Sequence, residues 1–131
     1  RLERFLYHEC GLKGLSGISN DVRVLEASAE PLARLALDHF VYRIAKEMGA
    51  LAAVLGGIDA LIFTAGIGEN AVDLRRRIAV AGAWLGLDLD DAANRAGSFD
   101  VTAPGARART LIVPTDEERM IAQHTRAVLA G

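Results

Sequence analysis

The sequence lacks the features that mark secreted, membrane-bound and nucleic-acid-binding proteins. Cys10 is the single cysteine, so the chain can form neither an internal disulfide nor a thiolate metal cluster, and this side chain is expected to be partly buried. No apolar run is long enough to cross a bilayer, and no segment has the order of a signal peptide. The formal net charge is -2, without a block of basic residues. These absences predict a cytoplasmic protein with neither nucleic acid nor a membrane as a partner.

The composition is typical of a folded domain. The 131 residues are 51% hydrophobic and 24% charged, which is enough apolar material to bury a core and too little charge for a disordered chain. Internal repeats and low-complexity tracts are absent from the sequence. We therefore expect one globular unit.

Apolar spacing and the positions of glycine and proline predict helices that alternate with short strands. The longest helix is expected to begin near Pro31 and to end at Gly56, with apolar residues along one face down to its last turn. The apolar runs 60–64 and 110–113 are expected to be strands buried on both faces of a sheet. Further helices are expected over 1–11, 19–27, 71–83 and 115–129, with irregular backbone near Gly14 and Gly17 and a loop with a short helix over 88–109.

Polar residues are expected to cap three of the helices. Ser19 is a suitable N-cap for the helix 19–27, and Asn70 for the helix that starts at 71. Thr115 and Glu118 have the spacing of a capping box, in which each side chain accepts from the backbone amide of the other. Arg75 to Arg77 are expected to form a solvated helix face rather than a phosphate clamp.

The most informative segment joins the first predicted strand to the helix after it. It reads Thr64-Ala65-Gly66-Ile67-Gly68-Glu69-Asn70. Glycines permit positive φ and let a ligand approach the backbone, and the free N–H groups of a helix start attract anions. By spacing alone, these glycines fit a ligand-free strand-to-helix turn equally well.

Three segments in the same order and spacing resemble the acetate kinases (acetokinase family). Residues 64–70 are similar to the adenosine-binding turn "GGIGEN" of that family. Residues 14–23, GLSGISNDVR, are similar to its segment "GLSGISSDMR", and residues 113–118, VPTDEE, to its C-terminal "IPTNEE". The departures are Ala65 for a glycine, Val22 for a methionine and Asp116 for an asparagine.

The resemblance implies an α/β fold, the ribonuclease-H-like domain of the acetate and sugar kinase and actin superfamily. Only the C-terminal αβαβα portion of such a domain is expected here. The family's phosphate loop "NSGSSSLK", its "HLGNG" turn and its catalytic arginine and histidine motifs are absent from the sequence. Residues 1–131 are therefore expected to be a C-terminal fragment of the second, adenosine-binding domain, with the N-terminal domain absent.

The resemblance also implies a nucleotide site. Asp21 and Arg23, two positions apart, would point about 200° apart on a helix, and by spacing alone they fit a dipole-complementing carboxylate and a surface arginine. In the family the matching residues contact ATP, so the carboxylate is expected to meet ribose hydroxyls and the guanidinium to stack on adenine. The residues expected to bind nucleotide are Asp21, Val22, Arg23, Gly66, Ile67, Gly68, Glu69 and Asn70.

The implied reaction is reversible transfer of the ATP γ-phosphoryl group to acetate, giving acetyl phosphate and ADP. Glu117 matches the family's magnesium-associated glutamate, so Mg²⁺ is the expected cofactor, and a homodimer is the expected assembly. This chain is expected to supply no catalytic residue. Two alternatives remain open: another short-chain carboxylate kinase, such as a propionate kinase, and a non-enzymatic ATP-binding module related to actin or an unrelated α/β binding module.

Overall fold

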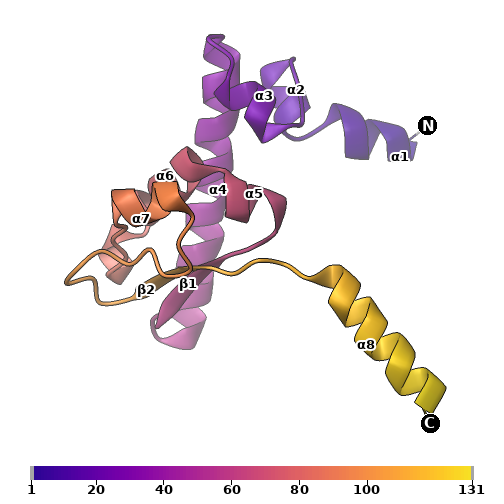
Figure 1. The fold of residues 1–131 in the computed structure, drawn as a ribbon. Helices are drawn as coiled ribbons and strands as arrows, with labels where there is room; N and C mark the ends of the chain where they lie inside the picture. Colours follow the sequence, from indigo (N-terminus) through magenta and orange to yellow (C-terminus); the bar gives the residue numbers. More distant parts are fainter. Residues whose placement is uncertain (1, 131) are drawn as a thin grey trace.

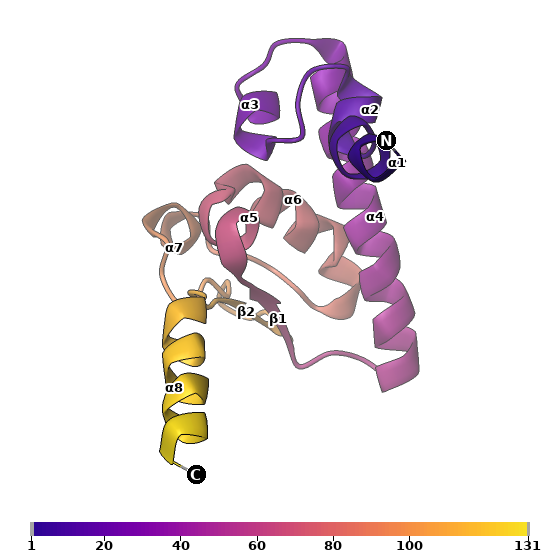
Figure 2. The ribbon, with the colours of Figure 1, turned by 90° about the vertical axis from the view of Figure 1, so that its right-hand side faces the viewer.

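The protein is described by a computed structural model over residues 2–130, in which the long helix α4 runs along one side of the sheet and of the helices α5 and α6 (Figures 1 and 2). The expected alternation of helices and two short strands is confirmed. In order, the elements are α1 (Leu2–Arg4), the π-helical η1 (Phe5–Glu9), α2 (Leu12–Ser16), α3 (Val22–Glu26), α4 (Pro31–Leu55), β1 (Ala60–Phe63), α5 (Ala65–Asn70), α6 (Val72–Ala81), the 3₁₀ turn η2 (Ala83–Leu85), α7 (Asp91–Ala96), β2 (Arg109–Ile112) and α8 (Glu117–Ala130).

Helix α4 has the predicted bounds. Proline at its first position has its φ already set for a helix, and Gly56 ends it in the left-handed conformation, at φ 77°. The predicted apolar face is buried at Leu37, Val41 and Met48, but Leu51 and Leu55 are 62% and 73% exposed. The prediction is wrong for these last turns, which extend past the helices that pack on α4, namely α2, α3 and α6 (Figure 2).

Strands β1 and β2 are adjacent and parallel, as expected, with Ala60 opposite Arg109 and Phe63 opposite Ile112. Burial alternates along both strands: Phe63 and Ile112 are buried, whereas Ile62 is 56% exposed. Within residues 2–130 the sheet therefore has one covered face. The prediction of strands buried on both faces is wrong for the part of the chain that the structure describes.

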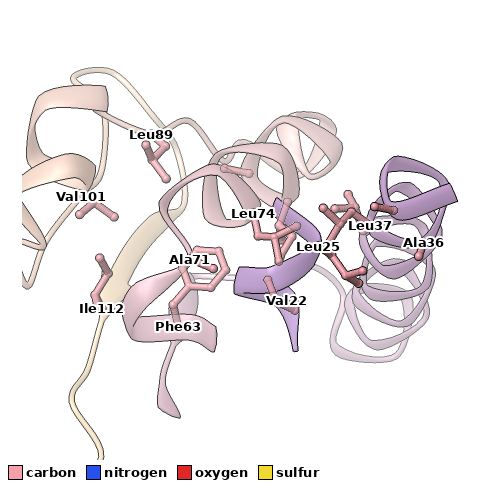
Figure 3. Packing of buried hydrophobic residues seen from close by; sticks show 14 residues of the cluster. Val22, Leu25, Ala36, Leu37, Phe63, Ala71, Leu74, Leu89, Val101 and Ile112 are labelled. Carbon is pink, nitrogen blue, oxygen red and sulfur yellow. The ribbon is translucent and has the colours of Figure 1, made fainter. Parts of the chain in front are cut away.

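The core joins the start of α3 to the helices and strands around the glycine-containing segment. Leu25 lies between Leu37 of α4 and Leu74 of α6 (Figure 3). Val22, at the first position of α3, is 4% exposed and belongs to the same cluster as Phe63. This packing fixes the segment around residue 21 beside the end of β1, although the two are about 40 residues apart in the sequence.

Two local predictions before α4 are wrong. Residues 12–16 form the short helix α2 where irregular backbone was expected, and Gly17 ends that helix with φ 69°. The N-cap of α3 is Asp21 instead of Ser19. The hydroxyl of Ser19 accepts from the amide of Asp21, which is two residues too early to cap the helix. Cys10 is partly buried, as predicted.

The segment between η2 and β2 agrees with its prediction. It contains the short helix α7 and two isolated antiparallel bridges, Leu89 to Thr102 and Asp100 to Leu111, in an otherwise irregular path. The two ends of the chain extend away from the centre (Figure 1). Every side chain of α8 from Glu117 to Leu129 is exposed. Among residues 2–130, no helix combines the length and the apolar character that crossing a membrane requires.

Candidate functional site

The glycine-containing segment forms the short helix α5 directly after β1. Neither Gly66 nor Gly68 adopts the positive φ that glycine permits. Among residues 2–130 the one non-glycine residue with positive φ is Ala65, at 58°. Gly68 is required for a different reason: a Cβ there would lie 3.1 Å from the carbonyl carbon of Phe63. A Cβ on Gly66 would meet no atom within 4 Å, so this position is open to a ligand.

A cavity of about 570 Å³ lies between the start of α3 and α5. It brings together six of the predicted nucleotide-binding residues, from two segments that the sequence separates by more than 40 positions. Gly68 and Glu69 do not line it. The lining residues are Asn20, Asp21, Val22, Arg23, Gly66, Ile67, Asn70 and Ala71.

Asp21 and Arg23 form an ion pair at the edge of this cavity. Oδ1 of Asp21 accepts from the backbone amide of Arg23 at 2.9 Å and from its Nε at 3.1 Å, while Oδ2 accepts from Nη2 at 2.6 Å. These hydrogen bonds, led by those from the guanidinium, lower the pKa of Asp21 below its usual value. The expected divergence of about 200° is wrong, because Asp21 is the N-cap and lies outside the helix.

Asn70 lines the cavity but does not cap the helix after it. Its Nδ2 donates to the carbonyl oxygen of Gly66 at 2.8 Å, one helical turn back. The N-cap position of α6 is held by Ala71, which has no side-chain cap. The predicted capping role is therefore wrong. The side chain of Asn70 instead forms a hydrogen bond within α5, at the wall of the cavity.

A second hollow, of about 440 Å³, adjoins the first through Gly66, which borders both. Its other walls come from Ala65 and from the segment before and at the start of α8. That segment contributes Thr115, Asp116, Glu117 and Glu118. Three consecutive carboxylates therefore border a hollow beside the cavity.

The predicted capping box of α8 is wrong. The hydroxyl of Thr115 accepts from the amide of Ala65 at 2.8 Å and donates to Oε1 of Glu69 at 2.7 Å, so it is directed toward α5. Asp116 caps α8 instead, because its Oδ1 accepts from the amide of Arg119 at 2.9 Å. Thr115 and Glu118 therefore do not cap the helix together.

Glu69 joins two of the three family-like segments. Its Oε1 accepts from both the amide and the hydroxyl of Thr115, at 2.9 and 2.7 Å. The amide of Thr115 is the largest cause of a pKa for Glu69 below its usual value, followed by the hydroxyl. Glu69 thus holds α5 against the segment that leads to α8, and it does not face the 570 Å³ cavity.

The residues around Glu117 fit one mode of magnesium binding and not another. Across residues 2–130, no group of three or more His, Cys, Asp or Glu side chains is close enough to enclose a metal ion. Magnesium is commonly held by one or two carboxylates together with waters and substrate phosphates. Glu117, exposed at the edge of the second hollow, suits that open mode.

Sequence reasoning missed the role of Arg75. It is 1% exposed, whereas its neighbours Arg76 and Arg77 are at the surface in ion pairs with Asp91 and Asp38. The predicted solvated face is right for the neighbours and wrong for Arg75. The spacing held a signal, because Ile78 and Ala79 lie three and four positions later on the same face of the helix and are buried.

Comparison with known proteins identifies the family. The sequence model described as the acetokinase family matches residues 1–123. The chain belongs to the acetokinase family. An acetate kinase from Nitrobacter hamburgensis is 53% identical over 129 residues, which are 98% of this chain and 32% of that protein. An acetate kinase from Rhizobium meliloti is 54% identical over 126 residues, 96% of this chain and 32% of that protein.

Solved structures of the family match this fold. The acetate kinase of Porphyromonas gingivalis superposes with a TM-score of 0.86 at 34% identity, over 98% of this chain and 34% of that one. A propionate kinase from Francisella tularensis superposes with a TM-score of 0.84 at 34% identity, over 93% of this chain and 32% of that one. The expected superfamily fold is confirmed. The chain spans about a third of the length of the curated relatives it matches.

Proposed function

We propose that this chain is the adenosine-binding C-terminal part of an acetate kinase, which reversibly transfers the ATP γ-phosphoryl group to acetate. The observation that carries the proposal is the 570 Å³ cavity, in which the segment around Asp21 meets α5. Its size suits a nucleoside. Membership of the acetokinase family supports the reaction. The proposal includes a cytoplasmic location and a homodimeric assembly of the full-length enzyme.

The cavity offers adenosine a flat cation, a carboxylate and an open backbone. The side chain of Arg23 is 83% exposed, so its guanidinium is free to stack on adenine while it remains paired with Asp21. The side chain of Asp21 is 37% exposed, so beside its bonds from Arg23 the carboxylate can still meet a ribose hydroxyl. Ile67, 43% exposed, supplies apolar surface.

The second hollow suits the phosphates only together with a cation. Asp116, Glu117 and Glu118 border it, and their charges would repel a polyphosphate that extends past Gly66. Mg²⁺ held by Glu117, largely through water, would neutralise that repulsion and shield the charge of the phosphates. The role of this chain is then to orient ATP.

Phosphoryl transfer depends mainly on positioning and charge neutralisation from both sides of a closed cleft. The acetate pocket and the cationic groups around the transferred phosphoryl are proposed to belong to the remainder of the enzyme. The 131-residue chain alone is therefore expected to be inactive. Since it keeps only the contacts to adenosine, it should bind ATP with roughly millimolar affinity or weaker, about 4 kcal/mol.

The test compares a full-length protein that carries this segment with the isolated chain. With acetate, ATP and Mg²⁺, the full-length protein should form acetyl phosphate, trapped as the hydroxamate, and the isolated chain should form none. Turnover by a purified isolated chain, or a full-length protein without ATP-dependent turnover, would contradict the proposal. The second outcome would favour a non-enzymatic ATP-binding module.

A propionate kinase is the second candidate, because a protein with that name matches the fold as well as the acetate kinases do. Since the acyl pocket is proposed to lie in the remainder of the enzyme, both enzymes could share the nucleotide site described here. The ratio of kcat/KM for acetate and propionate in the full-length protein distinguishes them. A higher kcat/KM for propionate than for acetate would show that the full-length protein is a propionate kinase.

A further inference from the structure

We propose that Arg75 is a positioning residue for the nucleotide site, and that its buried guanidinium sets the position of α5. The inference rests on the proposed function, because it assigns a role in binding ATP to a residue that does not line the cavity. Arg75 acts through the backbone of α5 and through α7, and it is not itself expected to touch the nucleotide.

The guanidinium of Arg75 connects α5, α6 and α7. Nη1 donates to the carbonyl oxygens of Gly68 and Glu69 at 3.0 and 2.8 Å. Nε and Nη2 donate to the side-chain and backbone oxygens of Asn94, at 2.7 and 2.9 Å. Asn94 is 1% exposed, and its Nδ2 donates to the carbonyl oxygen of Val72 at the start of α6. Four of the five N–H groups of the guanidinium therefore donate to oxygen atoms of α5 and α7.

Burying the charged guanidinium of Arg75 costs free energy that a buried apolar side chain would not cost. No ion pair among residues 2–130 includes Arg75, so its charge is balanced by oxygen dipoles alone, and burial lowers its pKa. A buried ion without a carboxylate is unfavourable, and an apolar side chain would fill the same volume without that cost. What the guanidinium adds is a set of fixed directions toward the last carbonyls of α5, which a helix end leaves unpaired.

Helix α5 is held at both ends by side chains from distant segments. Its first amide, that of Ala65, donates to the hydroxyl of Thr115, and its last carbonyls accept from Arg75. Between these two attachments lie Gly66 and Ile67, and Asn70 follows directly after them; all three line the cavity. A six-residue helix has little stability of its own. Loss of the Arg75 attachment should therefore displace the cavity wall.

The neighbouring arginine provides a matched control. Arg76 also links α6 to α7, through an ion pair with Asp91. Its side chain is 51% exposed, and among residues 2–130 its ion pair is with α7 and not with α5. Arg76→Met makes the same chemical change one position later. It tests whether any loss of a link between α6 and α7 is enough to affect the site.

The experiment measures KM for ATP, KM for acetate, kcat, the dissociation constant of ADP by calorimetry and the melting temperature in a full-length protein carrying this segment. Arg75→Met should raise KM for ATP and the ADP dissociation constant about tenfold, because the wall of the site is misplaced. KM for acetate should stay close to that of the unmodified protein. Arg75→Lys keeps the charge without the planar fork, so its effect should be intermediate. Arg76→Met should leave KM for ATP and the ADP dissociation constant unchanged.

Three results would overturn the role of Arg75. The first is a folded Arg75→Met protein with unchanged KM for ATP and ADP affinity, the second is an equal rise in KM for both substrates, and the third is the same effect in Arg76→Met. If Arg75→Met does not fold, Arg75→Lys decides, and an unchanged KM for ATP in that variant would overturn the inference. If the unmodified protein does not bind ADP, the proposed function fails, and the role of Arg75 fails with it.

Discussion

Helices α4 and α5 differ in what holds them in place. Helix α4 has 25 residues, a proline at its start, a left-handed glycine at its end and a core-facing row of apolar residues. Helix α5 has six residues, none of them buried, and depends on Thr115 and Arg75 from elsewhere in the chain. The long helix is stabilised by packing, whereas the short one, which borders the proposed site, is positioned by directional hydrogen bonds.

The largest effect on nucleotide use is expected from Gly68→Val. A Cβ at this position would lie 3.1 Å from the backbone of Phe63, and the two methyl groups would add to the overlap. The steric overlap should displace α5 and lower kcat/KM for ATP by about a hundredfold. KM for acetate should change far less. Steady-state kinetics of the full-length protein with each substrate varied in turn measure the difference.

The control for Gly68→Val is Leu37→Ala, a substitution that removes buried side-chain volume from α4. Leu37 is 6% exposed, and Leu37→Ala should lower the free energy of unfolding by about 3 kcal/mol. KM for ATP should stay near that of the unmodified protein, because Leu37 contacts the core and does not line the cavity. Equal rises in KM for ATP in both variants would show that α5 responds to global stability, and would remove the distinction between the two helices.

The contrast between the helices also explains which features the sequence could predict. The bounds of α4 follow from Pro31, Gly56 and apolar spacing, all of them local signals. The residues around the cavity followed from the family-like segments, since spacing alone favoured a surface role for Asp21 and Arg23. The bonding of Glu69 and Thr115 joins positions 46 apart, and that of Arg75 and Asn94 joins positions 19 apart. Such pairs depend on tertiary packing, and a local capping pattern therefore misassigned Thr115, Glu118 and Asn70.

A smaller effect is expected at the three consecutive acids before and in α8. Because Asp116 caps this helix, Asp116→Ala should lower the free energy of unfolding by about 1 kcal/mol, measured by chemical denaturation. Glu117→Ala should leave stability nearly unchanged and raise the Mg²⁺ concentration needed for half-maximal activity. Glu118→Ala is the control and should change neither. A loss of stability in Glu118→Ala as large as that in Asp116→Ala would restore the capping box.

The contact between Glu69 and Thr115 should make the attachment of α5 depend on pH. The pKa of Glu69 is lowered from its ordinary value of 4.5, so its ionised form is favoured in the folded protein. Its contribution to stability is therefore complete above pH 4.5 and is lost as the pH falls through the lowered folded-state pKa. The melting temperature of Glu69→Gln should lie below that of the unmodified protein at pH 7, and the gap should close in acid. A gap that stays constant with pH would contradict this assignment.

The smallest effect is expected from one substitution, alanine to glycine, made in both helices. Ala65 has φ 58°, a conformation that costs a residue with a Cβ about 1–2 kcal/mol, whereas glycine adds about 0.4–1 kcal/mol of entropy to the unfolded chain. Ala65→Gly should therefore stabilise the protein by about 0.5 kcal/mol. Ala53 is exposed within α4, and Ala53→Gly should destabilise by about 1 kcal/mol. Chemical denaturation of the two variants should give opposite signs, and a loss of stability in both would show that Ala65 is not strained.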